Sequence, residues 1–78
     1  MIPRKQMVVV TFYTTADAME MERLCKTHGI SGRVIPVPGA VTADCGLAWC
    51  SEPALEAGLR ELMKAAGLSC QGVYQLLV

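Results

Sequence analysis

The chain has 78 residues, which is the size of one small domain spanning residues 1–78. Seven basic and seven acidic residues balance to a formal net charge of zero, and the one basic cluster is the pair Arg4-Lys5. This composition gives no electrostatic footprint for nucleic acid or for an anionic membrane surface. No apolar run approaches the roughly 20 residues of a membrane span, which excludes a transmembrane helix.

Hydrophobic residues make up 53% of the chain, more than a lone core of this size needs. We therefore expect an exposed apolar face that meets a second copy of the chain, as a homodimer, or another protein. The alternative is a monomer with an apolar surface. Residues 3–6, Pro-Arg-Lys-Gln before a short Val run, do not have the form of a secretory signal. We expect a cytoplasmic protein whose four cysteines are mostly reduced.

The first predicted strand covers residues 7–13, which are dense in β-branched and aromatic side chains and indicate a buried central position. Thr14 and Thr15 end this strand and open a helix. Thr14 with Asp17 three positions later has the pattern of a capping box, with Asp in place of the usual Glu. The Asp side chain also suits the positive end of the helix dipole.

The first helix is predicted over residues 16–28, and Gly29 ends it as a left-handed cap. Apolar residues recur at the spacing of one helix face, and charged residues occupy the other. We expect the apolar face to point into the core. Its members are Ala18, Met21, Leu24 and Cys25.

The second half of the chain predicts strands over residues 31–37 and 47–50, separated by a loop with proline and glycine. Residues 51–53, Ser-Glu-Pro, start a second helix, because proline is tolerated in the first helical turn. Gly67 ends this helix, and residues 72–78 form a fourth strand. The predicted inward residues of the second helix are Leu55, Leu59, Leu62 and Ala66, with Met63 beside them.

The predicted order is β-α-β-β-α-β with two amphipathic helices, which is the split βαβ, ferredoxin-like arrangement of the α+β class. It consists of a four-stranded antiparallel sheet with both helices on one face. The other face is open and offers a place for a partner to dock.

This topology brings three connections to one edge of the sheet. They are the turn at Thr14 and Thr15, the central loop over residues 38–45, and the turn over residues 67–70. We therefore expect Cys45 to lie at the same edge as the start of the first helix and Cys70.

Cys45 is the main candidate for chemistry. The next residue, Gly46, lets the backbone come close to a ligand or a partner. A nearby helix N-terminus favours the thiolate form of a cysteine, so Cys45 is a candidate nucleophilic or carrier thiol, with Gly46, Thr14 and Thr15 as binding residues around it. Cys70 is a candidate resolving thiol. The alternative is that Cys45 is an ordinary small residue in a turn.

The other two cysteines are predicted to be structural. If residues 45–50 are extended, Cys50 lies roughly 16 Å from Cys45 at about 3.3 Å per residue, on the opposite face of the strand. A disulfide needs Cα atoms within about 7 Å, so we expect Cys50 to be a packed strand residue. Cys25 falls on the apolar face of the first helix, where a free cysteine acts as a small hydrophobic residue.

The sequence gives no sign of a metal site or of a bound cofactor. Paired short cysteine spacings are missing, and His28 is predicted at the opposite edge from Cys45, which also argues against a Cys-His hydrolase. No glycine-rich phosphate loop precedes a helix. Trp49 and Tyr74 are expected to pack in the core rather than at an interface.

Three segments together resemble the selenium/sulfur carrier-like family of small bacterial proteins. The resemblance covers nearly the whole chain, and its segments are Thr11-Phe12-Tyr13-Thr14-Thr15, Arg33-Val34-Ile35-Pro36-Val37-Pro38 and Cys45-Gly46-Leu47-Ala48-Trp49. It implies a cytoplasmic protein whose Cys45 carries sulfur or selenium as a persulfide or selenenyl sulfide between donor and acceptor proteins. The chain has Gly39 where a basic residue is expected after the second proline, which weakens charge stabilisation of the thiolate.

Three functions remain in competition. A carrier needs one accessible thiol and a docking surface, and its partners supply the acid–base chemistry, so the chain fits a carrier better than a stand-alone enzyme. A binding or regulatory module that dimerises or docks partners through the open sheet face is the alternative. A soft-metal chaperone would place Cys-x-x-Cys in the first strand-to-helix turn, where this chain has Thr14 and Thr15.

Overall fold

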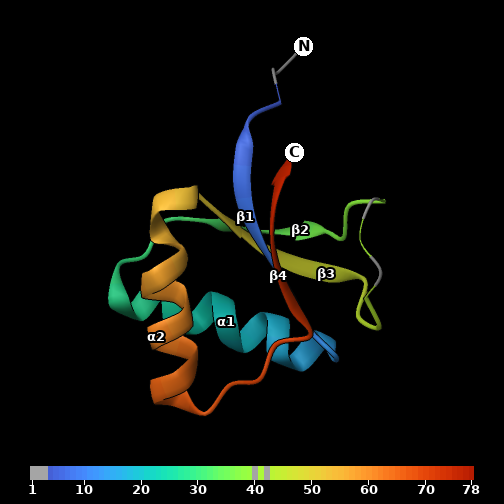
Figure 1. The fold of residues 1–78 in the computed structure, drawn as a ribbon. Coiled ribbons are helices and arrows are strands. Elements are labelled where there is room, and N and C mark those ends of the chain that lie inside the picture. Colours follow the sequence, from blue (N-terminus) through green and yellow to red (C-terminus); the bar gives the residue numbers. More distant parts are fainter. Residues whose placement is uncertain (1–3, 40, 42) are drawn as a thin grey trace.

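The computed structural model describes residues 4–39, 41 and 43–78, so positions 40 and 42 of the predicted central loop lie outside the described residues. Its elements are β1 (Gln6–Thr11), α1 (Thr15–His28), β2 (Arg33–Pro36), β3 (Leu47–Ser51), a short 3-10 helix η1 (Pro53–Leu55), α2 (Glu56–Ala66) and β4 (Gly72–Leu77) (Figure 1). The strands form one antiparallel sheet in the order β2-β3-β1-β4. The predicted α+β class, with four antiparallel strands and two helices, is confirmed. Among the described residues, no helix combines the length and the apolar character needed to cross a membrane.

The first strand is shorter than predicted. Its pairing with β3 and β4 ends at Thr11, two residues before the predicted end. The carbonyl of Phe12 instead accepts a hydrogen bond from the backbone N–H of Cys45, at 3.3 Å. The chain therefore leaves the sheet after Thr11, and Phe12 binds the loop that precedes β3 instead of a neighbouring strand.

Helix α1 begins at Thr15, one residue before the predicted start, and ends at His28 as predicted. Thr14 is the N-cap in an extended conformation, and its hydroxyl accepts a hydrogen bond from the backbone N–H of Asp17 at 3.1 Å. This contact satisfies one of the free N–H groups of the first turn. Gly29 adopts the left-handed conformation, with φ of 71°, and ends the helix. The predicted inward face is buried at every position: Ala18, Met21, Leu24 and Cys25.

Helix α2 differs in detail from the prediction. Pro53 starts a 3-10 turn, and the α-helix follows over Glu56–Ala66 and ends at Gly67, whose φ is 69°. Leu59 and Met63 are buried, and the other predicted leucines are half-buried. Ala66 is exposed, so its predicted inward position is wrong. It lies in the last turn of α2, beyond the buried part of the helix.

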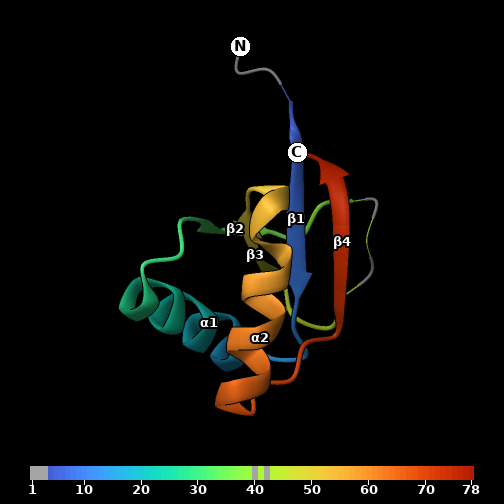
Figure 2. The same ribbon diagram turned by 60° about the vertical axis from the view of Figure 1, so that its left-hand side comes forward.

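Both helices pack against the same face of the sheet, and Figure 2 shows them on one side of β1 and β4. One hydrophobic cluster joins side chains of β1, α1, β3 and α2; its largest members are Trp49, Phe12, Met21 and Leu59. The predicted core position of Trp49 is confirmed. Its indole Nε1–H donates to Ser51 Oγ at 2.8 Å, and the Ser51 hydroxyl donates to the Ser31 carbonyl at 2.8 Å.

The second face of the sheet differs from the expectation of an exposed apolar surface. Val9, Ala48 and Cys50 occupy the middle of this face, and each is fully buried within a single chain. Tyr74, which pairs with Val9, is 37% exposed and not a core residue, contrary to expectation. Figure 1 shows β2 and β3 steeply inclined to β1 and β4, and running behind β4 in this view, so the sheet is strongly twisted around the small residues at its centre.

Candidate functional site

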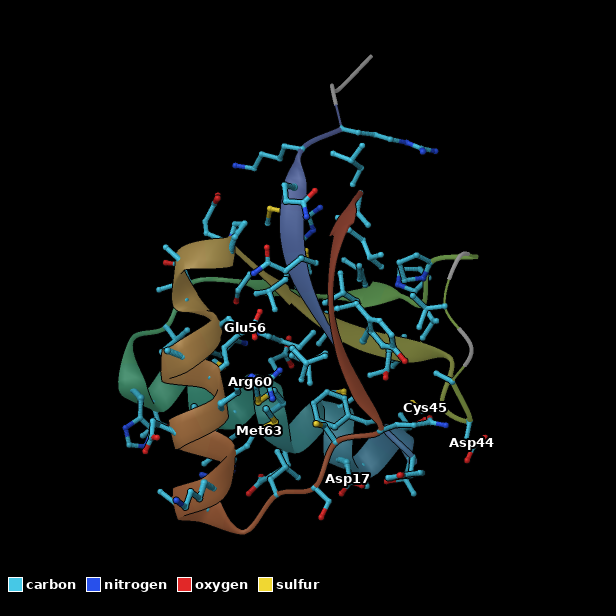
Figure 3. All side chains as sticks on the ribbon, in the orientation of Figure 1. Asp17, Asp44, Cys45, Glu56, Arg60 and Met63 are labelled. Carbon is cyan, nitrogen blue, oxygen red and sulfur yellow. The ribbon has the colours of Figure 1, made fainter. Side chains whose placement is uncertain are left out.

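Cys45 lies in a bent segment directly before β3, at the end of the molecule where α1 begins. Figure 3 shows it on the loop with Asp44, at the same end as Asp17 of the first turn of α1. The backbone N–H of Cys45 donates to the carbonyl of Phe12, which ties the loop to the end of β1. The expected placement of Cys45 beside the start of the first helix therefore matches the structure.

The Cys45 sulfur has two polar neighbours. The backbone N–H of Leu47 donates to Sγ at 3.4 Å. The hydroxyl of Thr15, the first residue of α1, lies 3.6 Å from Sγ, and either atom can donate. These two contacts hold the Cys45 sulfur in one position beside the start of α1.

The Cys45 side chain is buried, whereas the carrier interpretation of the sequence calls for an accessible thiol. Only 4% of Cys45 is exposed, and it belongs to the same hydrophobic cluster as Phe12 and Trp49. Cys45 is buried because its backbone N–H donates a hydrogen bond to Phe12, which holds the loop against the core. Gly46 is exposed, and a Cβ atom at Gly46 would meet no other atom within 4 Å. The residue next to buried Cys45 therefore lies at the surface with open space beside it.

The loop is also fastened to the start of β4. The backbone N–H of Asp44 donates to Gln71 Oε1 at 2.9 Å, and the backbone N–H of Gln71 donates to the Thr11 carbonyl at 2.7 Å. Cys70, the neighbour of Gln71, is half-buried and packs against the same core as Cys45. The three connections predicted at one edge are thus brought together. Cys45 and Cys70 are both free thiols.

The threonines predicted as binding residues around Cys45 play different roles. Thr15 contacts the sulfur, whereas the Thr14 side chain is used by the N-cap of α1 and acts on the site through the helix start. Sequence reasoning missed Leu47, which contributes a backbone N–H, and Gln71, which contributes a side-chain acceptor. Any residue except proline can supply a backbone N–H, so the sequence could not identify Leu47. A glutamine next to a turn is common, so Gln71 could not be identified either.

Cys25 and Cys50 are packed residues, as predicted. Both are fully buried. Burial raises the pKa of the Cys25 thiol to about 11. Burial also raises the pKa of Cys50, and the nearby Arg33 partly offsets that rise. Neither cysteine is set up to act as a nucleophile at neutral pH.

Metal-binding groups do not gather in the part of the chain that the structure describes. There, no three His, Cys, Asp or Glu residues lie close enough together to hold a metal ion. His28 lies in the last turn of α1, at the other end of a 14-residue helix from Thr15. That helix spans about 20 Å at 1.5 Å per residue, which keeps His28 away from the Cys45 sulfur.

Because the Cys45 sulfur is buried, its reaction with a solution reagent requires the loop to open. We expect Gln71→Ala to speed alkylation of Cys45 by iodoacetamide about fivefold, since the lost hydrogen bond to Asp44 is worth about 1 kcal/mol. Peptide mass spectrometry over time measures the rate. Gln75→Ala, which removes a side-chain bond to Glu56 instead, is the matched control and should leave the rate unchanged. An unchanged or slower rate in Gln71→Ala would refute this anchoring role.

A family model described as "Putative Se/S carrier protein-like" matches residues 7–75, nearly the whole chain. No curated protein and no solved structure matched. The matched range includes Thr15, Cys45 and Gln71, so all parts of the site described above fall within it. This chain belongs to the Se/S carrier-like family.

Proposed function

We propose that the protein carries sulfur or selenium on Cys45 and passes it between a donor and an acceptor protein in the cytoplasm. The observation that carries this proposal is the setting of the Cys45 sulfur, with the Leu47 N–H and the Thr15 hydroxyl at the start of α1. Membership of the Se/S carrier-like family agrees with it. The element order and the strand order β2-β3-β1-β4 support a ferredoxin-like scaffold for the site.

Loading is a transfer of sulfane sulfur without net oxidation. The Cys45 thiolate attacks the terminal sulfur of a persulfide on the donor protein. A sulfur–sulfur bond forms to Cys45 while the donor's sulfur–sulfur bond breaks, and the donor thiolate leaves with the electron pair. A perselenide donor gives the selenenyl sulfide by the same exchange. The Leu47 N–H and the Thr15 hydroxyl hold the attacking sulfur in position.

Unloading uses either an acceptor thiolate or a second thiol of the chain. An acceptor attacks the terminal sulfur and regenerates the Cys45 thiolate. In the second route, the Cys70 thiolate attacks Sγ of loaded Cys45, hydrosulfide leaves, and a Cys45–Cys70 disulfide forms. The joining of the two segments through Asp44 and Gln71 supports this resolving role for Cys70.

Access to the sulfur requires a partner to move the loop. Asp44 and Gly46 are exposed on either side of buried Cys45, and a hydrogen bond to Gln71 holds this segment closed. A donor protein that contacts the segment at Gly46 meets no side chain there. Burial would then protect a loaded sulfur atom from small thiols between transfers.

Mass spectrometry after incubation with a cysteine desulfurase and cysteine tests the proposal. The wild-type chain should gain the mass of one sulfur atom, and dithiothreitol should remove it. Cys45→Ser should show no gain, whereas the matched controls Cys25→Ser and Cys50→Ser, which change buried thiols elsewhere, should load like the wild type. Equal gain in Cys45→Ser would refute the site, and no gain in the wild type would refute loading.

The second candidate is a binding or regulatory module without covalent chemistry. The burial of the Cys45 side chain favours it, because a thiol packed among core residues also fits a purely structural role. Such a module would show no sulfur gain in the loading experiment and would keep its partner binding in Cys45→Ser.

A further inference from the structure

Strand β4 forms one edge of the sheet. It is the last strand in the order β2-β3-β1-β4 and pairs with β1 over six consecutive positions, from Gln6 opposite Leu77 to Thr11 opposite Gly72 (Figure 2). The register is continuous over these six pairs. An unbroken register leaves a regular strand whose outer side can accept a further strand.

The backbone groups on the outer side of β4 follow from the pairing pattern. Lys5 and Val78 exchange two hydrogen bonds, of 3.2 and 3.1 Å, so they form a closely bonded pair. In an antiparallel pair such positions alternate, so the N–H and C=O groups of Tyr74 and Leu76 point to β1. Those of Val73, Gln75 and Leu77 point outward. Within residues 4–39, 41 and 43–78, these outward groups have no backbone partner.

The two edges of the sheet differ in chemistry. At the opposite edge, β2 has only four residues, begins with Arg33 and ends with Pro36, and both residues discourage strand pairing. Strand β4 has six residues with the sequence Gly-Val-Tyr-Gln-Leu-Leu, without a charge or a proline. Leu77 is 61% exposed. The β4 edge thus lacks the features by which proteins prevent strands from pairing with other chains.

The same strand is complementary to itself when two copies run antiparallel about a two-fold axis at Gln75. In this register Gln75 faces Gln75 of the second copy, and Val73 faces its Leu77. Each of these facing pairs exchanges two backbone hydrogen bonds. Together the pairs use all the outward N–H and C=O groups of both copies. On the other face of the sheet, Tyr74 lies opposite Leu76, an aromatic–aliphatic cross-strand pair.

We infer that β4 is a self-pairing surface, and that two copies of the chain join through it into a continuous eight-stranded sheet. A second copy is the occupant because this register places apolar residues opposite apolar residues and brings no like charges together. A single strand pair is a small interface, so the dimer dissociates on dilution. The two strands run in opposite directions, so the two Cys45 loops lie at opposite ends of the interface and remain free. The inference is independent of the sulfur-carrier proposal.

Sedimentation velocity tests for the dimer. The concentration series should reach about 1 mM, because a weak dimer can have a dissociation constant of that order. The wild type should change from monomer to dimer as concentration rises. Gln75→Lys should weaken the dimer up to about fivefold, because it sets two lysines directly opposite each other and a cross-strand pair is worth up to about 1 kcal/mol. Within one chain the new lysine faces Glu56, which Gln75 already contacts, so the monomer should stay folded. Met19→Lys on α1, with the same change in charge at a half-exposed apolar residue, should not weaken it.

Cross-linking tests the register. Facing residues of a closely bonded pair have Cα atoms about 5.5 Å apart, within disulfide range, so on mild oxidation the Gln75→Cys variant should form a disulfide that joins the two copies through position 75. Leu77→Cys should not cross-link to itself, since its two copies would lie four residues, or about 13 Å, apart along the strands. A wild type that stays monomeric overturns the inference. So does a dimer that Gln75→Lys does not weaken, or one that cross-links through position 77.

Discussion

Replacing Gly32 with alanine is expected to lower the free energy of unfolding by about 3 kcal/mol, the upper range for an overpacked site. A Cβ atom at Gly32 would lie 2.5 Å from the Cys50 carbonyl oxygen, 2.5 Å from Ser51 Oγ and 2.6 Å from Cζ2 of Trp49. The first of these is backbone and the other two are buried side chains. The segment before β2 would have to move away from β3, which would break the bond from Ser51 to Ser31.

Gly58→Ala is the matched control for this substitution. Gly58 lies inside α2, and a Cβ atom there meets nothing within 4 Å. Alanine should stabilise the chain by about 0.5 to 1 kcal/mol through its higher helix propensity. Urea unfolding followed by circular dichroism measures both values. If Gly32→Ala were as stable as the wild type, the close packing of this segment on β3 would be wrong.

Raising the pH from 9 to 11 is expected to cost the fold roughly 2 kcal/mol through Cys25 alone, since the slope is at most about 1.4 kcal/mol per pH unit and is smaller at both ends of this range. The pKa of Cys25 rises from its ordinary value of 9.0 to about 11 in the folded chain because the thiol is buried. Between these values the unfolded chain releases this proton and the folded chain keeps it. Stability is therefore complete below pH 9 and falls until about pH 11. Urea unfolding at a series of pH values measures the slope.

Cys25→Ala removes one of two buried thiols with a raised pKa and should reduce the slope over this range, whatever the substitution costs at neutral pH. Cys50→Ala should reduce it as well, because burial raises the pKa of that thiol too. A wild-type stability that is constant from pH 9 to 11 would contradict the burial of Cys25.

The buried thiol at the site and the buried thiols of the scaffold differ in their surroundings. Cys45, Cys25 and Cys50 are all inaccessible to solvent or nearly so. Cys45 alone among them has both a backbone N–H and a hydroxyl near its sulfur in the described structure. Burial raises the pKa of the Cys25 and Cys50 thiols, whereas two polar groups hold the Cys45 sulfur in position at the start of α1. This contrast is why we place the carrier role on Cys45.

Local signals in the sequence predicted much of the secondary structure. The extended apolar runs, the cap at Thr14, the left-handed glycines at Gly29 and Gly67 and the apolar face of α1 all match the structure. These features depend on contacts within a few residues, so residue type and spacing are enough to specify them. Ala66 failed as an inward residue because the extent of helix packing depends on what lies opposite the helix.

The sequence by itself determined a formal net charge of zero, the α+β class and the placement of Cys45 near the start of the first helix, because strand and helix periods and their order restrict the topology. Only the tertiary structure decided that the Cys45 sulfur is buried, that Leu47 and Thr15 contact it and that Gln71 holds its loop. It also decided that the centre of the second sheet face is covered within one chain. Burial and long-range hydrogen bonds depend on sheet twist and on where distant segments meet, which the local sequence pattern does not encode.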